Sequence, residues 1–477
     1  KTIENAILSS GPRSGRSMCL QVGIITGYTI LNGVDHMAVK VGLVGTGTVG
    51  GGCIDILHNH KEDFLRHYGI DIELVRVCSR EPEQAEAHGV ADIFTEDFND
   101  IINDPEIDIV IELIGGTGIA KQVILDALNA GKNVVTANKA VMATSGEEIM
   151  ALAEEKGVEL AFEASVGGGI PIIGPLKHSL IANEISAVMG IVNGTTNYML
   201  TRMADNGLSY EDALHEAQQK GFAEADPTAD VDGFDAAAKI AILASIAFNS
   251  RVKLNDVYTE GIRNITQLDM DTADDMGYVI KLLALAHRTP EGIDVRVHPT
   301  MLPKAHQMAQ VNGVFNAIYV TGDAVGETMF YGAGAGSFPT ASAVVGDILS
   351  LSEQISRGVA PLPEIEPYGH NLAFKPMDEL QTKYYVRLKV ADRVGALSET
   401  VDIFAKHNIS ISLINQVEDG KSGVNDACSV IFLTHRALEK DVQAAAAELA
   451  NVGCVAEVAN VLRIEDVEAW TEGVMAN

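Results

Sequence analysis

From residue 38 to about residue 136, short apolar runs, several of which end near glycine, alternate with helical patterns. Runs of this kind are typical of strands that a parallel sheet buries on both faces. The expected strands are 38–44 (AVKVGLV), 72–80, 107–114 and 133–136, and the expected helices are 49–67 and 118–130. This strand–helix alternation predicts a doubly wound α/β sheet of the Rossmann type.

A second pattern begins near residue 158, where strand-like runs mix with longer helical segments. The expected strands are 158–166 (VELAFEASV), 184–194 (EISAVMGIVNG) and 316–322 (NAIYVTG), and the expected helices are 209–220 and 234–248. We expect a second, mixed α/β domain over 158–356 that serves catalysis and dimerisation. The first domain should span 38–157, together with part of 335–360.

The C-terminal part follows a third pattern. Residues 357–383 contain four prolines and little periodicity, which indicates a linker. From Tyr384 the order is strand, helix, strand, strand, helix, strand within about 80 residues, which predicts a ferredoxin-like βαββαβ domain over 384–465.

Residues 1–36 differ in pattern from the rest of the chain. We expect them to be a non-native or over-extended start with little order, and a transit peptide is the alternative.

The charge balance narrows the choice of partners. The chain has 34 Lys and Arg against 65 Asp and Glu, a net charge of −31. A surface this acidic repels phosphate backbones and anionic lipids, so we expect neither a nucleic-acid nor a membrane partner. The five cysteines are scattered without C-x-x-C spacing, which fits a reducing, cytoplasmic location.

A glycine-rich turn directly follows the first expected strand. Gly45, Gly47 and Gly50 form G-x-G-x-x-G, with Thr48 and Val49 opening the helix. This spacing permits a tight turn, close approach of the backbone to a pyrophosphate and close helix packing, while free helix amides bind the phosphates. We therefore expect dinucleotide binding through these five residues, and a structural glycine turn is the alternative.

The end of the second strand bears on cofactor choice. An NAD site usually places Asp or Glu there, whereas this chain has Ser79 and Arg80. A hydroxyl and a guanidinium suit a 2′-phosphate, so NADP(H) is favoured, with NAD(H) possible. Arg80 as a solvated surface charge is the alternative.

An acidic segment at 221–239 carries the densest candidate chemistry. Asp235 and Lys239 are four apart at the start of an expected helix and therefore share a face. The helix continues into an apolar stretch, so Lys239 should be partly desolvated, which can lower a lysine pKa. Lys139 follows a strand end, where ligands bind in such sheets. A solvated acidic loop and a surface lysine are the alternatives.

These segments together resemble homoserine dehydrogenases from residue 38 to about 356, most specifically at 217–239. The resemblance implies NADPH-dependent reduction of L-aspartate 4-semialdehyde to L-homoserine, in threonine, methionine and isoleucine biosynthesis. It implies that Lys239 donates the proton with Lys139 as electrostatic partner, and that Glu224, Asp230 and Asp235 bind substrate. Gly221 and Gly336 resemble nicotinamide-side contacts, and Lys139 also contacts cofactor. The loop of Glu163, Val166, Gly168 and Ile170 resembles a monovalent cation site, with sodium implied.

The tail resembles an ACT domain through V-A-D-R-V-G-A-L (390–397) and H-N-I-S-I (407–411). Val394 stands where proline is usual. The resemblance implies an amino-acid effector, threonine by analogy, held by Gly395 and Asn408 and shared across two tails. An effector shared in this way implies a homodimer or homotetramer. A tail that only joins subunits is the alternative.

Other functions are compatible with parts of this sequence. A semialdehyde dehydrogenase of the phosphorylating type needs a cysteine nucleophile beyond the nucleotide domain, and no cysteine lies between residues 78 and 428. A related NADP-dependent semialdehyde oxidoreductase stays open. So does a non-catalytic regulator that senses NADPH or an amino acid, although such a protein could dispense with Lys239 and Asp235.

Overall fold

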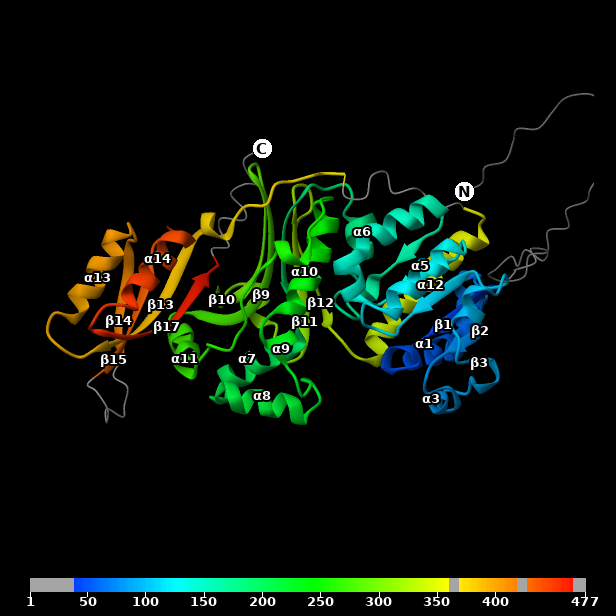
Figure 1. The fold of residues 1–477 in the computed structure, drawn as a ribbon, viewed down its shortest axis with the longest axis horizontal. Coiled ribbons are helices and arrows are strands. Elements are labelled where there is room, and N and C mark those ends of the chain that lie inside the picture. Colours follow the sequence, from blue (N-terminus) through cyan, green and yellow to red (C-terminus); the bar gives the residue numbers. More distant parts are fainter. Residues whose placement is uncertain (1–37, 360–368, 418–426, 466–477) are drawn as a thin grey trace, which may run out of the picture. The chain divides into compact units, whose positions relative to one another are not determined.

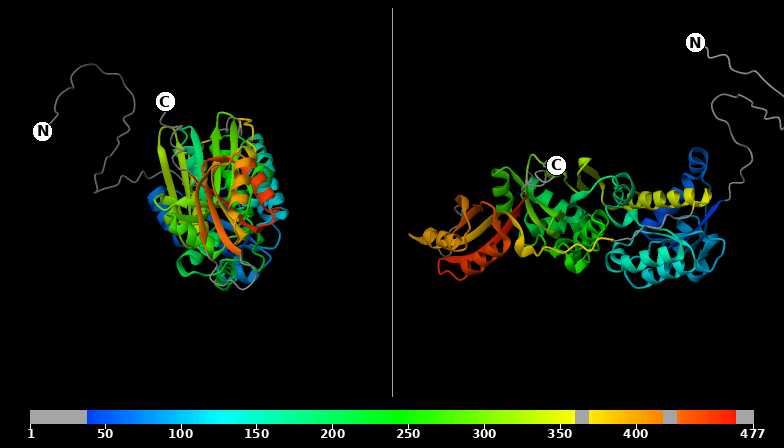
Figure 2. Two further views of the ribbon diagram at one scale, coloured as in Figure 1. Left: turned by 90° about the vertical axis from the view of Figure 1, so that its left-hand side faces the viewer. Right: turned by 90° about the horizontal axis from the view of Figure 1, so that it is seen from above.

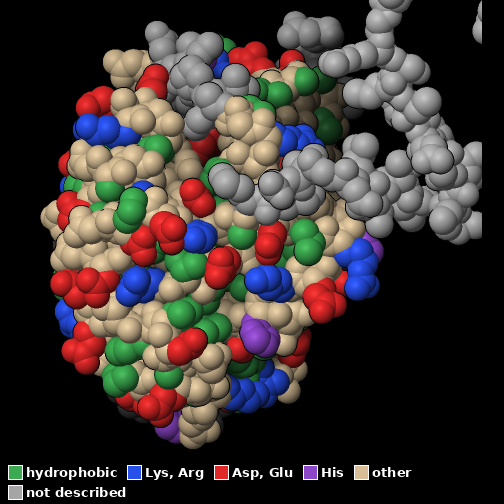
Figure 3. Space-filling view, turned by 90° about the vertical axis from the view of Figure 1, so that its right-hand side faces the viewer, with side chains coloured by type: hydrophobic (Ala, Val, Ile, Leu, Met, Phe, Trp, Pro, Cys, Tyr) green, Lys and Arg blue, Asp and Glu red, His purple; other side chains and the backbone are tan. Residues whose placement is uncertain are grey.

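The computed structural model describes residues 38–359, 369–417 and 427–465 (Figure 1). The expected leader, residues 1–36, lies outside the described residues. Within the described ranges, no helix combines the length and apolar character that a membrane crossing requires. On the face drawn in Figure 3, acidic and basic side chains are interspersed.

The first sheet is parallel and has the strand order β3-β2-β1-β4-β5-β6. Its strands are β1 (Val39–Val44), β2 (Ile72–Cys78), β3 (Phe94–Thr95), β4 (Ile109–Glu112), β5 (Asn133–Thr136) and β6 (Leu160–Ala161). The order reverses between β1 and β4, and the crevice beyond the carboxyl ends of these strands is where such sheets bind ligands. The predicted Rossmann-type fold is confirmed.

Helices cover both faces of this sheet (Figure 2). Helices α1 (Thr48–Asn59) and α12 (Ser337–Ser356) share one apolar core, and α5 (Ile119–Asn129) and α6 (Lys139–Lys156) contribute to the other. Shorter helices are α2 (Lys61–Asp63), α3 (Pro82–Ala87) and α4 (Asn99–Ile102). The expected single helix over 49–67 is wrong. Helix α1 ends at Asn59, and after His60 the chain continues in the short helix α2 and a π-helical turn, Phe64–Tyr68, whose Phe64 packs against the core of α1.

The second sheet places β12-β11-β7-β9-β10 side by side in antiparallel pairs. Its strands are β7 (Ile185–Ile191), β8 (Tyr258–Thr259), β9 (Tyr278–Thr289), β10 (Gly292–Pro303), β11 (Phe315–Gly322) and β12 (Gly326–Ala333). Its helices are α7 (Gly194–Asn206), α8 (Tyr210–Gln219), α9 (Thr228–Val231), α10 (Phe234–Ala247) and α11 (Gln267–Asp275). Helix α10 is buried continuously from Asp235 to Ser245, so it is the central helix of this layer.

The expected strand over 158–166 is wrong in extent, because only Leu160–Ala161 pair with β5. The chain then turns at Glu163–Ser165. The Glu163 carboxylate accepts hydrogen bonds from the backbone amides of Ile172 (2.6 Å), Ile173 (2.8 Å) and Gly174. These bonds fold the glycine-rich loop back on itself and end the strand.

The C-terminal region confirms the βαββαβ order, with one added two-residue strand. Its elements are β13 (Gln381–Ala391), α13 (Ala396–Lys406), β14 (Ile411–Val417), β15 (Ala427–Thr434), β16 (Ala437–Leu438), α14 (Glu439–Leu449) and β17 (Val455–Ile464). Strand β17 pairs in parallel with β10, so the two sheets continue into one another.

The described part of the expected linker is not a free spacer. Ile293 on β10 donates its amide hydrogen bond to Ala373 and accepts one from Lys375, each at 2.8 Å. A buried ion pair, Arg387 with Asp269, also joins β13 to α11. The C-terminal region is therefore attached to the catalytic layer by backbone pairing and by buried charge.

Candidate active site

The glycine turn after β1 has the geometry of a phosphate cradle. Gly45 has φ +106° and accepts no larger residue, because a Cβ there would meet the backbone of Leu113. A Cβ on Gly50 would overlap the Gly45 carbonyl. A Cβ on Gly47 would meet only open space, and no side chain in the described residues caps the α1 N-terminus there. The first amides of α1, at Thr48 and Val49, therefore remain available to an anion.

A second helix begins beside the first. The Ser337 hydroxyl donates a hydrogen bond of 2.6 Å to the Thr48 carbonyl, and Gly336 precedes α12 with φ +130°. Gly336, which is expected on the nicotinamide side, is therefore the neighbour of Ser337, the residue that contacts the glycine turn. The other such residue, Gly221, is exposed at the end of α8 with φ +74°.

The end of β2 presents an exposed Arg80 after a half-buried Ser79. The Ser79 hydroxyl accepts a hydrogen bond from the Glu81 amide at 3.2 Å, and Gln84 binds the Glu81 carboxylate. Glu81 is thus already engaged by its own helix. The guanidinium of Arg80 has no recorded partner within the described ranges.

Two lysines and one carboxylate meet where the first sheet faces α10. Lys239 donates hydrogen bonds to Asp235 Oδ2 at 2.7 Å and to the Val192 carbonyl at 2.6 Å. Lys139, the first residue of α6 after β5, forms an ion pair with the other oxygen of Asp235. Asp235 and Lys239 are 6% and 8% exposed, whereas the Lys139 side chain is 45% exposed. One ammonium is therefore held inside the protein and the other at its surface.

The two ammonium groups decide the charge of Asp235. Burial alone would raise the pKa of this carboxyl, but Lys239 and Lys139 outweigh it and hold the pKa below its ordinary value. Asp235 therefore stays ionised at neutral pH and can hold both lysines in place.

Asn193 belongs to the same cluster, although no role for it was expected from the sequence pattern. Its amide nitrogen donates hydrogen bonds to Asp230 at 2.7 Å and to Asp235 at 2.9 Å. Its amide oxygen accepts from the Thr196 amide at 2.9 Å and so caps α7. The only signal in the sequence was an asparagine at a helix start, N-G-T-T.

The remaining acidic residues of this segment are not gathered with Asp235. Asp232 pairs with Arg263, and Asp226 accepts a hydrogen bond from the Thr228 amide at 3.1 Å. Glu224 is exposed, and its side chain has no recorded partner in the part of the chain that the structure describes. Hydrogen bonds and ion pairs thus join Lys139, Asp230, Asp235 and Lys239, partly through Asn193, whereas Glu224 has no recorded bond to them.

The expected cation loop is tightly folded. Gly167 and Gly168 are both left-handed, with φ +75° and +56°, and a Cβ on Gly168 would meet the Gly334 backbone. The Glu163 carboxylate accepts three amide hydrogen bonds, two on Oε1 and one on Oε2, so carbonyl oxygens would have to supply most ligands of a cation. No recorded hydrogen bond in the described ranges ends on the carbonyls of Val166, Gly168 or Ile170. Carbonyl oxygens without a recorded hydrogen bond are ligands of the kind that hard cations take.

An acidic residue of α12 faces this loop. The Asp347 carboxylate accepts a hydrogen bond from the Glu163 amide at 2.9 Å. Burial raises the pKa of Asp347 to about 7, and the negative charge of Glu163 adds to the rise.

The two expected effector residues lie at opposite ends of α13. Gly395 precedes the helix with φ +90°, and Asn408 follows it with φ +58°. The helix between them has eleven residues and is roughly 16 Å long. A single amino acid cannot contact both within one tail.

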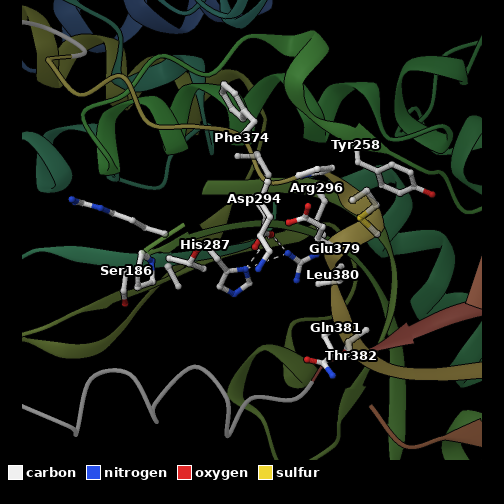
Figure 4. Close-up of a pocket in the computed structure, with 18 of the residues that line it drawn as sticks. Ser186, Tyr258, His287, Asp294, Arg296, Phe374, Glu379, Leu380, Gln381 and Thr382 are labelled. Carbon is white, nitrogen blue, oxygen red and sulfur yellow. Dashed lines mark hydrogen bonds and ion pairs between the residues drawn. The ribbon is translucent and has the colours of Figure 1, made fainter. Parts of the chain in front are cut away.

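A cavity of about 1090 Å³ is lined by none of these residues (Figure 4). Its lining includes Ser186, His287, Asp294, Arg296 and Glu379. Arg296 forms an ion pair with Asp294, and burial together with the Arg296 charge lowers the pKa of His287 to about 3. A neutral histidine and a paired arginine offer no centre for aldehyde reduction, so the cavity is not the active site.

Three family profiles match this chain. "Homoserine dehydrogenase, NAD binding domain" matches residues 45–163, "Homoserine dehydrogenase" matches 171–349, and "ACT domain" matches 384–454. The homoserine dehydrogenase of Synechocystis is 43% identical over 90% of this chain and 100% of its own length. That of Neisseria gonorrhoeae is 40% identical over 90% and 99%.

Solved structures agree with these matches. A homoserine dehydrogenase from Thiobacillus denitrificans has a TM-score of 0.85 and 43% identity, covering 90% of this chain and 99% of its own. A hyperthermophilic archaeal homoserine dehydrogenase in complex with NADPH has a TM-score of 0.58 and 26% identity, covering 66% and 98%. With its NAD-binding, catalytic and ACT domains, the chain belongs to the homoserine dehydrogenase family, oxidoreductases that act on CH–OH donors with NAD(P).

Proposed function

We propose that this chain reduces L-aspartate 4-semialdehyde to L-homoserine with NADPH, in the biosynthesis of threonine, methionine and isoleucine. The observation that carries the proposal is the buried Lys239–Asp235 pair, joined by Lys139 from the nucleotide-binding sheet. When bound, the reduced nicotinamide supplies the hydride. Residues of the chain donate the proton, stabilise the developing charge and bind the substrate.

Lys239 is the proposed proton donor, and its ammonium stabilises the alkoxide that forms at the aldehyde oxygen. Lys139 adds a second positive charge from the more exposed side. Asp235 holds both lysines. Because a carboxylate oxygen accepts two hydrogen bonds, Asp235 Oδ1 still has room for the substrate ammonium.

Glu224 and Asp235 are proposed to bind that ammonium, with Asp230 in support. One oxygen of Asp230 accepts a hydrogen bond from Asn193, and the exposed Glu224 side chain has no recorded partner in the described residues. Both carboxylates can therefore accept further hydrogen bonds. Their negative charge fixes the orientation of the amino acid relative to the lysines.

Gly45, Gly47, Thr48, Val49 and Gly50 are proposed to hold the pyrophosphate, with Gly221 and Gly336 near the nicotinamide and Lys139 touching both ligands. The open space at Gly47 and the uncapped α1 N-terminus support this. An exposed Arg80 without an acidic partner supports NADPH over NADH, because a guanidinium suits the 2′-phosphate.

A sodium ion is proposed for the loop of Glu163, Val166, Gly168 and Ile170, bound by backbone carbonyls. Its role would be to fix the loop against Gly334. The Asp347 carboxylate, in contact with the Glu163 amide, adds negative charge near such an ion.

Threonine is the proposed feedback inhibitor, bound between the ACT domains of two subunits. The helix of roughly 16 Å between Gly395 and Asn408 requires a contribution from each tail, so the enzyme is a homodimer or homotetramer. Edge strand β14 supports this pairing, because its Leu413 and Ile414 are each 41% exposed.

The test follows reduced-nicotinamide absorbance with aspartate semialdehyde, NADPH or NADH, and with or without threonine. We expect turnover that is faster with NADPH at low cofactor concentration and slower with threonine. Cofactor binding without turnover would instead support the non-catalytic regulator. Turnover that threonine leaves unchanged would remove the regulatory proposal but keep the enzyme.

A further inference from the structure

Glu112 is a fully buried carboxylate at the carboxyl end of β4. It is 0% exposed, and acidic side chains are almost never buried to this degree unless they are paired. Its recorded partners in the described residues are neutral donors. One oxygen accepts hydrogen bonds from the amides of Ile114 at 2.8 Å and Gly115 at 3.3 Å, and the other accepts one from the Thr136 hydroxyl at 2.7 Å. Glu112 therefore joins the loop after β4 to the end of β5.

The loop that Glu112 holds lies beside the phosphate cradle. A Cβ on Gly45 would meet the backbone of Leu113 and the amide nitrogen of Ile114. Gly115 and Gly116 follow with φ +80° and +73°; both are exposed, and a Cβ on either would meet only open space. Since the strand order reverses between β1 and β4, this loop borders the cofactor crevice.

The Thr136 hydroxyl continues the connection to α6. It accepts a hydrogen bond from the Asn138 amide at 3.0 Å, and the Asn138 side chain donates one of 2.7 Å back to the Gly116 carbonyl. The side-chain oxygen of Asn138 also accepts from the Val141 amide at 3.1 Å and so caps α6. A closed set of hydrogen bonds therefore ties the loop after β4 to the residue that precedes Lys139.

Lys139 needs such support, because its ion pair with Asp235 holds it only weakly. The Lys139 side chain is 45% exposed, and solvent weakens an ion pair in which one partner is this exposed. Reaction rates, by contrast, fall steeply when a group in an active site is displaced by about 1 Å. The backbone from which the Lys139 side chain starts must therefore be held by other bonds, and the bonds of Asn138 are adjacent to it in the chain.

We propose that Glu112 is a positioning residue for the reaction. Acting through Thr136 and Asn138, it fixes the first turn of α6 against the loop after β4. The Lys139 ammonium is thereby held in place relative to the cofactor crevice. Hydrogen bonds to a carboxylate are stronger than those between neutral groups, which suits this task. The inference rests on the proposed role of Lys139 as electrostatic partner in the reduction.

The test is a double-mutant cycle between Thr136 and Lys139, measured in kcat and in NADPH affinity without substrate. Thr136→Val keeps the shape of the side chain but removes the hydroxyl, and it leaves the amides of Ile114 and Gly115 on Glu112. We expect kcat to fall about tenfold to a hundredfold. The dissociation constant of NADPH should stay within about threefold. Lys139→Met should lower kcat about a hundredfold by itself, and in that background Thr136→Val should change kcat by less than about twofold.

Two further variants separate positioning from stability. Thr136→Ser keeps the hydroxyl and should retain kcat within about twofold. Asn138→Ser keeps a cap on α6, since serine caps helices as well as asparagine does, but its shorter side chain does not reach the Gly116 carbonyl. It should repeat the effect of Thr136→Val, and this effect should also disappear in the Lys139→Met background.

Asn133→Ala is the matched control, because Asn133 lies at the other end of β5. Its side-chain oxygen accepts a hydrogen bond from the Glu159 amide at 2.9 Å, so this variant also removes a bond that ties β5 to a neighbouring segment. We expect a lower melting temperature and an unchanged kcat.

Equal losses of kcat from Thr136→Val with and without Lys139 would overturn the inference and leave the proposed function standing. So would a loss of NADPH affinity as large as the loss of kcat, because the bonds would then serve the cofactor loop. An unchanged kcat in Lys139→Met would overturn the inference together with the proposed role of Lys139. Absence of turnover in the unaltered protein would overturn both proposals.

Discussion

The ammonium group of Lys139 forms an ion pair with the carboxylate of Asp235, although 96 residues separate them in the sequence. Lys139 begins α6 at the carboxyl end of β5, and Asp235 lies in the first turn of α10. The pair joins the nucleotide-binding sheet to the segment that carries the buried Lys239. A substrate that reaches Lys239 must therefore sit beside the cofactor crevice.

Replacing Asn193 tests the positioning of the two carboxylates. Asn193→Ala removes the hydrogen bonds to Asp230 and Asp235, and we expect turnover to fall about tenfold to a hundredfold, because small misplacements in an active site are costly. The cap of α7 is lost as well, worth about 1 kcal/mol. Ser209→Ala is the control, since Ser209 caps α8 through the Asp212 amide. It should lose similar stability in urea but keep turnover, and equal turnover in both variants would contradict the positioning role.

The buried pair between Arg387 and Asp269 should stabilise the attachment of the ACT domain. Their side chains are 4% and 0% exposed, and Arg387→Ala leaves an uncompensated buried carboxylate. We expect a loss of about 3–5 kcal/mol in urea unfolding, partly recovered in Asp269→Asn/Arg387→Met. Lys389→Ala, on the same strand, breaks only an exposed pair with Glu457 and should cost below about 1 kcal/mol. Similar losses for the two single variants would refute the assignment.

Arg80→Ala tests the choice of cofactor. Removing the guanidinium should raise the dissociation constant of NADPH by about tenfold and leave that of NADH nearly unchanged, since only NADPH carries the 2′-phosphate. Fluorescence titration of both cofactors measures this, with the exposed Arg66→Ala as control. Parallel weakening of NADPH and NADH would rule out a 2′-phosphate contact.

Asp347 should make stability depend on pH. Its pKa is about 7 in the folded protein, because of burial and the nearby Glu163, against 3.8 for the ordinary group. Between these values the folded state binds the proton more tightly than the unfolded state, so stability falls as pH rises from about 4 to 7. Asp347→Asn should match the unaltered protein near pH 4 and be more stable above pH 7. The scans need sodium-free buffer, since a bound cation would favour the ionised carboxylate; coincident curves would contradict the prediction.

The parts of the fold that could be predicted are those with local signals. The glycine turn, the helix of Asp235 and Lys239, and the βαββαβ order all follow from spacing within a few dozen residues. The strand at 158–166 could not be predicted correctly, because the Glu163 carboxylate ends it through amides nine to eleven residues further on.

The contacts within the candidate site could also be predicted only where they are local in the sequence. Asp235 and Lys239 share a face by helical spacing, so their contact is visible in the sequence. Their contacts with Lys139 and Asn193 arise only when different elements pack together. Glu224 lies close to Asp235 in the sequence, yet it is exposed, and its side chain has no recorded bond to the cluster in the described residues.

The most direct test of the account is turnover of Lys239→Ala, with cofactor affinity measured on the same preparation. Lys281→Met is the control, because Lys281 is another buried lysine but contacts Asn197 and Val311 rather than Asp235. We predict that kcat of Lys239→Ala falls about 10²- to 10⁴-fold while NADPH binds with nearly unchanged affinity, and that folded Lys281→Met keeps its turnover. Turnover of Lys239→Ala within about threefold of the unaltered protein would contradict proton donation by this lysine.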